Sequence, residues 1–214
     1  MADQLYQTVL LVGAPGAGKG TQGKILAQIP GFFHLSVGEV FRTIDIHSTL
    51  GKIFYECSSR GELVPDEVTV RMWRENIHAQ TVLGLFKPSV DLLVLDGIPR
   101  NVHQAELIEK YVQVLKIVRL VCPDKEEMIR RLRRRALKEN RADDAREDVI
   151  RRRWEIYERE TKPILEYYPS ELVAEVDAIG SPGRILQTIL EAVVPVQEAH
   201  FTNPVSGDMA DAAV

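Results

Sequence analysis

A glycine-rich segment near the amino terminus constrains this chain more than any other part of its sequence. Residues 13–21 read G-A-P-G-A-G-K-G-T, between the apolar run Thr8–Val12 and Gln22–Ile29, which has helical composition. Strand, glycine loop and helix in this order are the setting of a phosphate-binding loop, and the spacing G-x-x-x-x-G-K is intact. Glycines let backbone N–H groups turn toward a phosphate, the helix N-terminus faces the same point, and a lysine adds a mobile positive charge. The segment therefore predicts a phosphate site, against the alternative of an ordinary strand-to-helix turn rich in glycine.

One position in this loop departs from the usual form. The residue after Lys19 is normally a Ser or Thr whose hydroxyl group binds Mg²⁺, but here it is Gly20, and the hydroxyl comes at Thr21. A metal ion would then need another protein ligand. Asp96, which ends the apolar run Leu92–Leu95, is the acidic candidate, binding Mg²⁺ directly or through water. The ordinary alternative is a turn, since Asp-Gly is a common turn dipeptide.

Apolar runs alternate with helical segments along the chain. The strand-like runs are Thr8–Val12, Asp91–Leu95, Lys116–Val121 and Leu172–Val176, with a further short candidate at His34–Ser36. This alternation predicts an α/β fold in which a parallel sheet is covered by helices on both faces. Ligands of such sheets bind beyond the carboxyl ends of the strands, where the glycine-rich loop begins.

The remaining segments are predominantly helical. Residues 36–70 have a helical pattern with breaks at Gly51, Gly61 and Pro65, which predicts a small helical lobe inserted between strands. Two later helices are expected at Glu126–Lys138 and Asp148–Tyr167. From residue 195 onward we find no periodicity, so residues 195–214 are expected to form a flexible tail. The chain of 214 residues fits one domain, residues 1–194, with inserted lobes.

Composition excludes several classes of function. A net charge of −4 argues against generic nucleic-acid binding. No apolar run reaches the length of a membrane span, and the first residues lack the pattern of a signal peptide, so we expect a cytoplasmic protein without a membrane partner. Cys57 and Cys122 are too few for a zinc cluster, and we expect them to be packing or surface thiols.

Arginines are concentrated between residues 126 and 159. They are Arg130, Arg131, Arg133, Arg134, Arg135, Arg141, Arg146, Arg151, Arg152 and Arg153. Three interpretations stay open at this point: a solvated helix face paired with nearby acidic residues, a nucleic-acid patch, or a clamp for transferring phosphates. Arginine suits the last role because its planar fork binds two oxygens at once and keeps its charge. We expect most of them at the surface and a minority in a site.

Five motifs carry a resemblance to a known family. They lie at Gly13–Thr21, His34–Arg42, Gly61–Glu67, Leu95–Ala105 and Arg141–Asp144. Together they resemble the short-lid adenylate kinases, within the nucleoside monophosphate kinase family, and the match runs from about Val9 to Leu190. The resemblance implies a P-loop NTPase-like parallel sheet with a helical NMP-binding lobe at about residues 36–65 and a short lid at about residues 134–144. The Gly20-Thr21 pair is that family's own pattern.

The resemblance also implies roles for individual residues on the donor side. ATP phosphates would be wrapped by Gly16, Ala17, Gly18, Lys19, Gly20 and Thr21. Lys19 would contact the β- and γ-phosphates, Arg131 would stack on the donor base, and the Gly180 backbone would contact the donor adenine. Asp96 would hold Mg²⁺, through water. Arg135 would make a neighbouring phosphate contact.

On the acceptor side, the resemblance implies that Arg42 and Arg100 grip the α-phosphate of AMP. The acceptor base would be read by the backbone around Glu62, Leu63 and Val64 and by the side chain of Gln104, and Val37 and Gly97 are further positions of the AMP site. Arg141 and Arg153 would close over the moving phosphoryl group, with Arg152 as a rival for the second position.

Three positions divide the family's branches at the acceptor base. Val37 stands where adenylate kinases commonly have Thr, and Asn101 also resembles the branch that acts on UMP and CMP. Gln104, by contrast, is typical of the AMP branch, and a carboxamide can bond an adenine edge bidentately.

The expected reaction is Mg²⁺-dependent phosphoryl transfer from ATP to AMP, giving two ADP. An acceptor that is already a phosphate oxygen needs no general base, so catalysis reduces to aligning two nucleotides and neutralising charge. We expect a monomer whose partners are ATP, AMP and ADP. The alternatives are a UMP/CMP kinase of the same fold, or a regulatory protein that binds adenine nucleotides without turnover.

Overall fold

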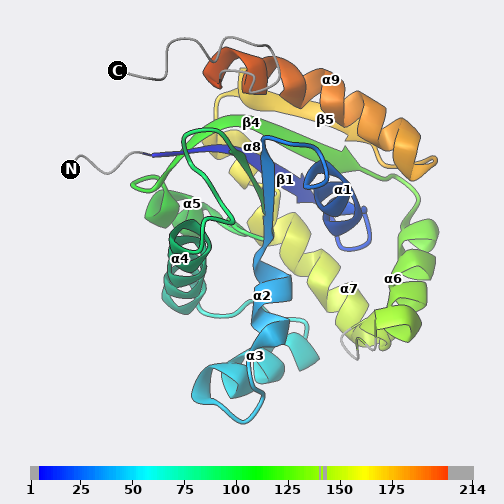
Figure 1. Ribbon diagram of the computed structural model, residues 1–214. Helices are drawn as coiled ribbons and strands as arrows, with labels where there is room; N and C mark the ends of the chain where they lie inside the picture. Colours follow the sequence, from blue (N-terminus) through cyan, green and yellow to red (C-terminus); the bar gives the residue numbers. More distant parts are fainter. Residues whose placement is uncertain (1–4, 140, 142–143, 202–214) are drawn as a thin grey trace, which may run out of the picture.

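A five-stranded parallel sheet forms the centre of the molecule (Figure 1). The structure is a computed structural model, and it describes residues 5–139, 141 and 144–201. The strand order across the sheet is β2-β3-β1-β4-β5, and every neighbouring pair is parallel. The strands are β1 (Tyr6–Gly13), β2 (Phe32–Ser36), β3 (Leu92–Asp96), β4 (Val112–Val121) and β5 (Val173–Asp177). The parallel sheet predicted from the apolar runs is confirmed, including the short candidate that became β2.

The register of the strands brings the motif-bearing ends together. Ser36 pairs with Asp96, Asp96 with Leu11, and Gly13 with Leu120. The carboxyl ends of β2, β3 and β1 therefore meet at one edge of the sheet, which is where parallel sheets bind ligands.

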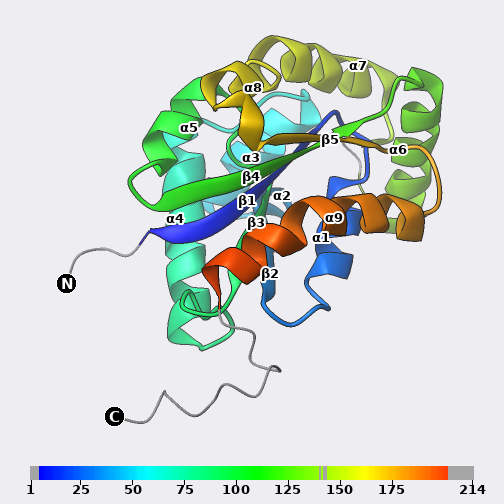
Figure 2. The ribbon, with the colours of Figure 1, turned by 90° about the horizontal axis from the view of Figure 1, so that it is seen from above.

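Helices cover both faces of the sheet (Figure 2). They are α1 (Lys19–Leu26), α2 (Val37–Thr43), α3 (Thr49–Ser59), α4 (Asp66–Val82), α5 (Val102–Ile108), α6 (Lys125–Glu139), α7 (Glu147–Ile156), α8 (Ile164–Tyr167) and α9 (Pro182–His200). Helices α1 and α9 lie on one face, and α4, α5 and α8 lie on the other. None of the helices within the described residues is both long and apolar enough to cross a membrane.

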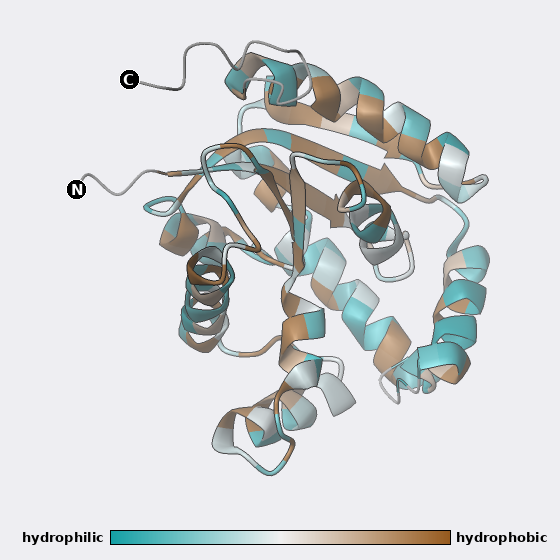
Figure 3. Cartoon of the chain, viewed as in Figure 1, coloured by the Kyte–Doolittle hydropathy of each residue, from teal (hydrophilic) through white to brown (hydrophobic). Residues whose placement is uncertain are grey.

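The core follows the two-residue period of the strands. In β1, Leu10 and Val12 belong to the buried cluster on the face of the sheet that α4 covers. Val9 and Leu11 belong to the cluster on the opposite face, under α1 and α9. Figure 3 shows the result: hydrophobic strands in the centre and polar residues along the outer helices. Because β1 is buried on both faces, it reads as a continuous apolar run rather than an alternating one.

The predicted helical lobe consists of α2 and α3, which project below the sheet in Figure 1. Its two helices are joined by stacking of Phe41 on Phe54, with ring centroids 5.1 Å apart. Ser48 caps α3 by accepting a hydrogen bond of 3.0 Å from the Gly51 N–H. Gly61, in a left-handed conformation with φ of 72°, follows the end of α3 as the predicted break, whereas the break expected at Gly51 is wrong, because Gly51 lies inside α3.

Two helix boundaries differ from the sequence-based expectation. The helix expected over Asp148–Tyr167 is divided: α7 ends at Ile156, a π-helical turn spans Tyr157–Thr161, and α8 follows. In the turn, the N–H of Lys162 donates to the carbonyl oxygen of Tyr157, one residue further back than in an α-helix.

The second difference is at the carboxyl end. The prediction of a flexible tail from Pro195 onward is wrong for its first six residues, because α9 continues through Pro195 to His200. Burial of Ile189 and Val193 against the sheet, and a 3.3 Å hydrogen bond from Gln197 Nε2 to the Pro30 carbonyl, hold the helix there. The rest of the expected tail, residues 202–214, lies outside the described residues.

Candidate active site

A single cleft of about 640 Å³ opens at the carboxyl ends of β1, β2 and β3. Its wall comes from the glycine-rich loop, the α2–α3 lobe, the ends of β1 and β3, and the inner faces of α6 and α7. The structure places every candidate donor and acceptor residue along this wall. They are Gly16, Ala17, Gly18, Lys19, Gly20, Thr21, Val37, Arg42, Glu62, Leu63, Val64, Asp96, Gly97, Arg100, Gln104, Arg131, Arg135, Arg141, Arg153 and Gly180.

The glycine-rich loop curls between the end of β1 and the start of α1. Gly16 and Gly18 have φ of 89° and 98°, a conformation that favours glycine. A Cβ atom on Gly16 would lie 2.8 Å from the Met128 carbonyl oxygen, whereas one on Gly18 would meet nothing within 4 Å. The loop is therefore pressed against α6 on one side, and its other side and the N-terminus of α1 face the cleft.

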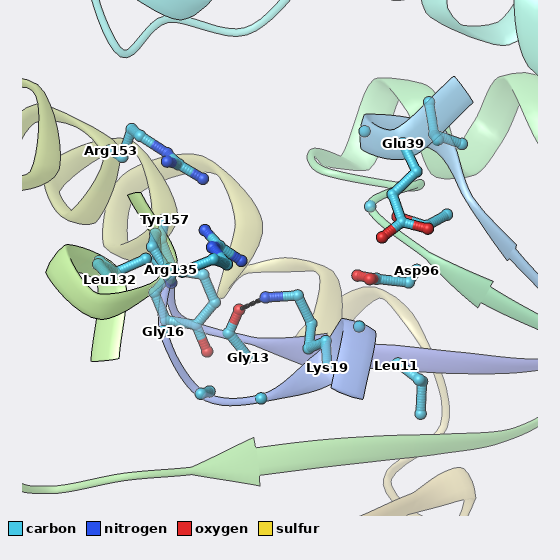
Figure 4. A pocket seen from close by; sticks show the side chains of 18 of the residues that line it. Leu11, Gly13, Gly16, Lys19, Glu39, Asp96, Leu132, Arg135, Arg153 and Tyr157 are labelled. Carbon is cyan, nitrogen blue, oxygen red and sulfur yellow. Dashed lines mark hydrogen bonds between the residues drawn. The ribbon is translucent and has the colours of Figure 1, made fainter. Parts of the chain in front are cut away.

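Lys19 lies at the centre of the site (Figure 4). Its ammonium group donates hydrogen bonds to the carbonyl oxygens of Gly13, at 2.6 Å, and Ala14, at 3.3 Å. Burial is the main cause that lowers the pKa of Lys19 to about 8; Asp96 opposes this shift, and the charges of nearby arginines, Arg100 first among them, add to it. The surroundings therefore disfavour a positive charge in the absence of a bound anion.

The residues around Asp96 could hold a metal ion by one carboxylate, with phosphate oxygens of a nucleotide as further ligands. Asp96 is 7% exposed and lies across from Lys19 in Figure 4. A Cβ atom at Gly20 would be 3.5 Å from Asp96 Oδ2, so glycine at this position leaves the carboxylate accessible. Within the described residues, no group of three or more acidic, histidine or cysteine side chains could form a complete metal cage. This donor set suits Mg²⁺, which is commonly held by one or two carboxylates together with substrate phosphates and water.

Two further arginines, Arg42 on α2 and Arg100 after β3, line the cleft. Arg100 Nε donates to the Gly97 carbonyl oxygen at 3.1 Å, and Thr161 Oγ1 donates to the Arg100 carbonyl oxygen at 2.7 Å. Burial, followed by the charge of Arg153, lowers the pKa of Arg100 to about 10. Arg42 Nη1 donates to the Gly38 carbonyl oxygen at 2.5 Å, and its guanidinium lies 5.6 Å from the centre of the Phe54 ring. These side chains form a strongly positive wall, which favours the binding of an anion.

The wall beside these arginines combines apolar surface with one amide. Val37, at the start of α2, is 2% exposed. Gln104, on α5, is 1% exposed; its Oε1 accepts from the Arg100 N–H at 2.8 Å, and its Nε2 donates to Asp66 Oδ1 at 2.7 Å. Both ends of the carboxamide thus have a protein partner.

A buried carboxylate organises the arginines of α6 and α7. The side chain of Asp144 is completely buried, and it is bound by Arg135 at 2.6 Å, by Arg141 at 3.3 Å and by Arg153. Burial lowers the pKa of Arg135, and Asp144 opposes that shift. Asp144 lies in one of the sequence motifs, but no role was predicted for it.

The structure separates Arg153 from its rival. Arg153 lines the cleft beside Arg135 in Figure 4. Arg152 does not line it, and pairs with Glu155 at 3.3 Å on the outer side of α7. Arg131 donates to the Ala178 carbonyl oxygen at 2.9 Å and so lies close to the segment that contains Gly180.

Most of the other arginines have the surface role that the sequence allowed. Arg130, Arg133, Arg146 and Arg151 form ion pairs with acidic residues on exposed helix faces. Arg134 is an exception, because it lines the cleft although it was not a candidate. Lys138, Tyr157 and Thr161 line the cleft too and were likewise missed.

Comparison with known proteins agrees with this geometry. The adenylate kinase family model matches residues 11–173. Curated relatives called adenylate kinase include one from Thermus thermophilus, 35% identical, covering 87% of this chain and 97% of its own. Another, from a Nocardioides species, is 38% identical and covers 89% of this chain and 99% of its own. A third, from a Synechococcus species, is 39% identical and covers 88% of this chain and 98% of its own. The chain therefore belongs to the adenylate kinase family, and is a phosphotransferase that moves the terminal phosphoryl group of ATP to AMP, giving two ADP.

Proposed function

We propose that the cleft binds the two nucleotides end to end, with ATP on the glycine-rich loop and AMP between the α2–α3 lobe and the end of β3. One observation carries this proposal: a single cavity joins two separate sets of phosphate-binding groups. Backbone N–H groups of the glycine-rich loop and Lys19 line this cavity, and so do Arg42 from α2 and Arg100 from the segment after β3. Two anionic ligands can meet only where both sets face the same space.

The phosphoryl group that moves between the two nucleotides would be stabilised by Arg135, Arg141 and Arg153. Phosphoryl transfer spreads negative charge over three equatorial oxygens, and arginine forks bind such oxygens in pairs. The acceptor is a phosphate oxygen that is already deprotonated, so no side chain needs to act as a base. The catalytic contribution of these residues is alignment and charge neutralisation.

Asp96 would hold the Mg²⁺ that accompanies ATP, through coordinated water. Gly20 supports this role because it leaves the space in front of the carboxylate clear. When bound, Mg²⁺ would neutralise charge on the β- and γ-phosphate oxygens.

Base recognition would use the remaining candidates. Arg131 and the Gly180 backbone would contact the donor base. Val37, residues 62–64, Gly97 and Gln104 would surround the acceptor base. The departure at Val37 removes one hydroxyl group from this surface, and the carboxamide of Gln104 is the polar group that we expect to distinguish adenine.

Closure of the helical lobe (about residues 36–65) and the lid (about residues 134–144) would exclude water, since water would otherwise compete with AMP as acceptor. We further propose a monomeric, cytoplasmic enzyme that acts in adenine nucleotide homeostasis without a nucleic-acid or membrane partner. One chain supplies all of the candidate residues, which supports a monomer. Cys57 and Cys122 are free thiols, which suits a reducing compartment.

The acceptor assignment is tested by assaying the purified protein with MgATP and either AMP, CMP or UMP. We expect the highest kcat/KM with AMP. Faster turnover of CMP or UMP would contradict the assignment of the acceptor base site. Replacing ATP by GTP in the same assay measures the preference for the donor base.

The arginine assignment has a matched control on the same helix. Arg153→Ala should lower kcat about 10²–10³-fold, by analogy with the loss of a preorganised oxyanion donor. Arg152→Ala removes an equal charge from the outer side of α7 and should leave kcat near the wild-type value. Similar losses in both variants would indicate a general effect of charge and would overturn the specific role of Arg153.

A further inference from the structure

Asp66 belongs to a part-buried hydrogen-bond network and has no role in the proposed reaction. It begins α4, which lies beside α5 (Figure 1). Its carboxylate does not line the cleft but contacts Gln104, which does. Gln104 is therefore the cleft residue through which Asp66 can act on the acceptor directly. The inference below rests on the proposed function, in which Gln104 reads the acceptor base.

The partners of Gln104 determine which end of its carboxamide is oxygen and which is nitrogen. The backbone N–H of Arg100 can only donate, so the group 2.8 Å from it must be Oε1. A carboxylate can only accept, so the group 2.7 Å from Asp66 Oδ1 must be Nε2. Rotating the amide by half a turn would place two donors together at Arg100 and two acceptors together at Asp66. The two contacts therefore fix one orientation of the amide.

Asp66 is itself held in place. Asn101 Nδ2 donates to Oδ1 of Asp66 at 3.0 Å and to Oδ2 at 3.1 Å. Asn101 Oδ1 in turn accepts from the Gln104 N–H at 2.7 Å and caps α5. The closed set of hydrogen bonds keeps the carboxylate aimed at the amide, and it gives Asn101 a use that its resemblance to the pyrimidine branch does not suggest.

An amide in this orientation still has one lone pair on Oε1 and one N–H on Nε2. That edge complements a base that presents an N–H donor next to a ring-nitrogen acceptor, as the 6-amino group and N1 of adenine do. Hypoxanthine has the same size and shape but presents the opposite order, with an acceptor at O6 and a donor at N1–H. We propose that Asp66 is a positioning residue that makes the enzyme select 6-amino over 6-oxo purine monophosphates, by preventing rotation of the Gln104 amide.

The test compares AMP with inosine monophosphate (IMP) as acceptor in the wild type and in Asp66→Asn. An asparagine has nearly the same shape but can offer either an acceptor or a donor to Gln104, so only the Arg100 N–H would still oppose rotation of the amide. The ratio of kcat/KM for AMP to that for IMP should fall about tenfold, because a bidentate amide contact discriminates between bases by factors of this order. Asp66→Ser, which also removes the carboxylate, should lower the ratio in the same direction.

Glu67→Gln is the matched control. It removes the same charge from the next position of α4, and Glu67 contacts the exposed His103 rather than Gln104. This variant should keep the wild-type ratio. An unchanged ratio in both Asp66 variants, or an equal loss with AMP and IMP, would overturn the inference, because a purely structural role would affect both acceptors alike.

Gln104→Met separates this inference from the proposed function on which it rests. If Gln104→Met leaves the KM for AMP unchanged, Gln104 does not read the base and the proposed site is wrong. If Gln104→Met raises that KM while the Asp66 variants keep the wild-type ratio, the site is right and the role of Asp66 alone is wrong.

Discussion

The hydroxyl group of Thr161 donates a 2.7 Å hydrogen bond to the backbone carbonyl oxygen of Arg100. The two residues are 61 positions apart in the sequence, and both line the cleft. The π-helical turn that interrupts the path from α7 to α8 ends at Thr161. Such turns are frequent at functional sites, because they change the direction of a side chain within an otherwise helical segment.

Thr161→Val should weaken the positioning of Arg100 without changing side-chain volume much. Loss of one hydrogen bond of this kind is worth about 1 kcal/mol, so we expect kcat/KM for AMP to fall about fivefold. Thr161→Ser keeps the donor and should retain most of the activity. Steady-state kinetics with AMP varied at saturating MgATP measures both variants, and equal losses in the two would show that the methyl group matters rather than the hydroxyl.

The pH dependence of ATP use should report Lys19. Its pKa in the free enzyme is lowered to about 8 by burial, so the ammonium loses its proton as the pH rises through that value and binds phosphates less well. We therefore expect kcat/KM for MgATP to be constant below pH 8 and to fall above it. Bound phosphates favour the charged form, so kcat should fall only at a higher pH. A kcat/KM profile that stays flat to pH 10 would contradict this shift.

Asp144→Asn should destabilise the fold as well as the site. The side chain of Asp144 is completely buried among three arginines, and removing its charge leaves theirs uncompensated. A loss of about 3 kcal/mol in the free energy of unfolding is typical of such a change. Urea unfolding measures it, with Asp148→Asn as the control. Asp148 pairs with Arg146 on an exposed surface, and its replacement should have little effect.

Substitutions at two glycines of the phosphate loop distinguish the cost of a steric collision from the cost of backbone strain. Both have positive φ, but only a Cβ atom on Gly16 would collide with a backbone carbonyl, that of Met128. Gly16→Ala should therefore lower the free energy of unfolding by at least about 1 kcal/mol more than Gly18→Ala, whose cost is backbone strain. Parallel urea unfolding curves test the difference, and equal losses would mean that α6 moves to accommodate the added carbon.

Much of the fold could be predicted from the sequence because its signals are local. The run before the phosphate loop is apolar on both faces of β1, and that alone indicates a buried parallel strand. The choice between Arg152 and Arg153 could also have been made. Arg153 is four residues after Val149 and four before Tyr157, both buried, so the helical period places it on the inner face of its segment.

Features that depend on tertiary contacts could not be predicted in this way. A proline usually ends a helix, yet α9 continues past Pro195 because its neighbours are held by the sheet and by Pro30. Nothing in the local sequence of Thr161 indicates a contact with Arg100. The sequence likewise places Asp144 near Arg141, but only the arrangement of α6 and α7 brings Arg135 and Arg153 to the same carboxylate.

The buried carboxylate of Asp144 also affects when conformational entropy is lost. An arginine side chain that is free in solution samples many rotamers, and ordering three of them around a phosphoryl group would oppose each catalytic cycle. Arg135, Arg141 and Arg153 share Asp144 in the folded chain. Part of the entropy cost of ordering these side chains therefore belongs to folding rather than to each catalytic cycle.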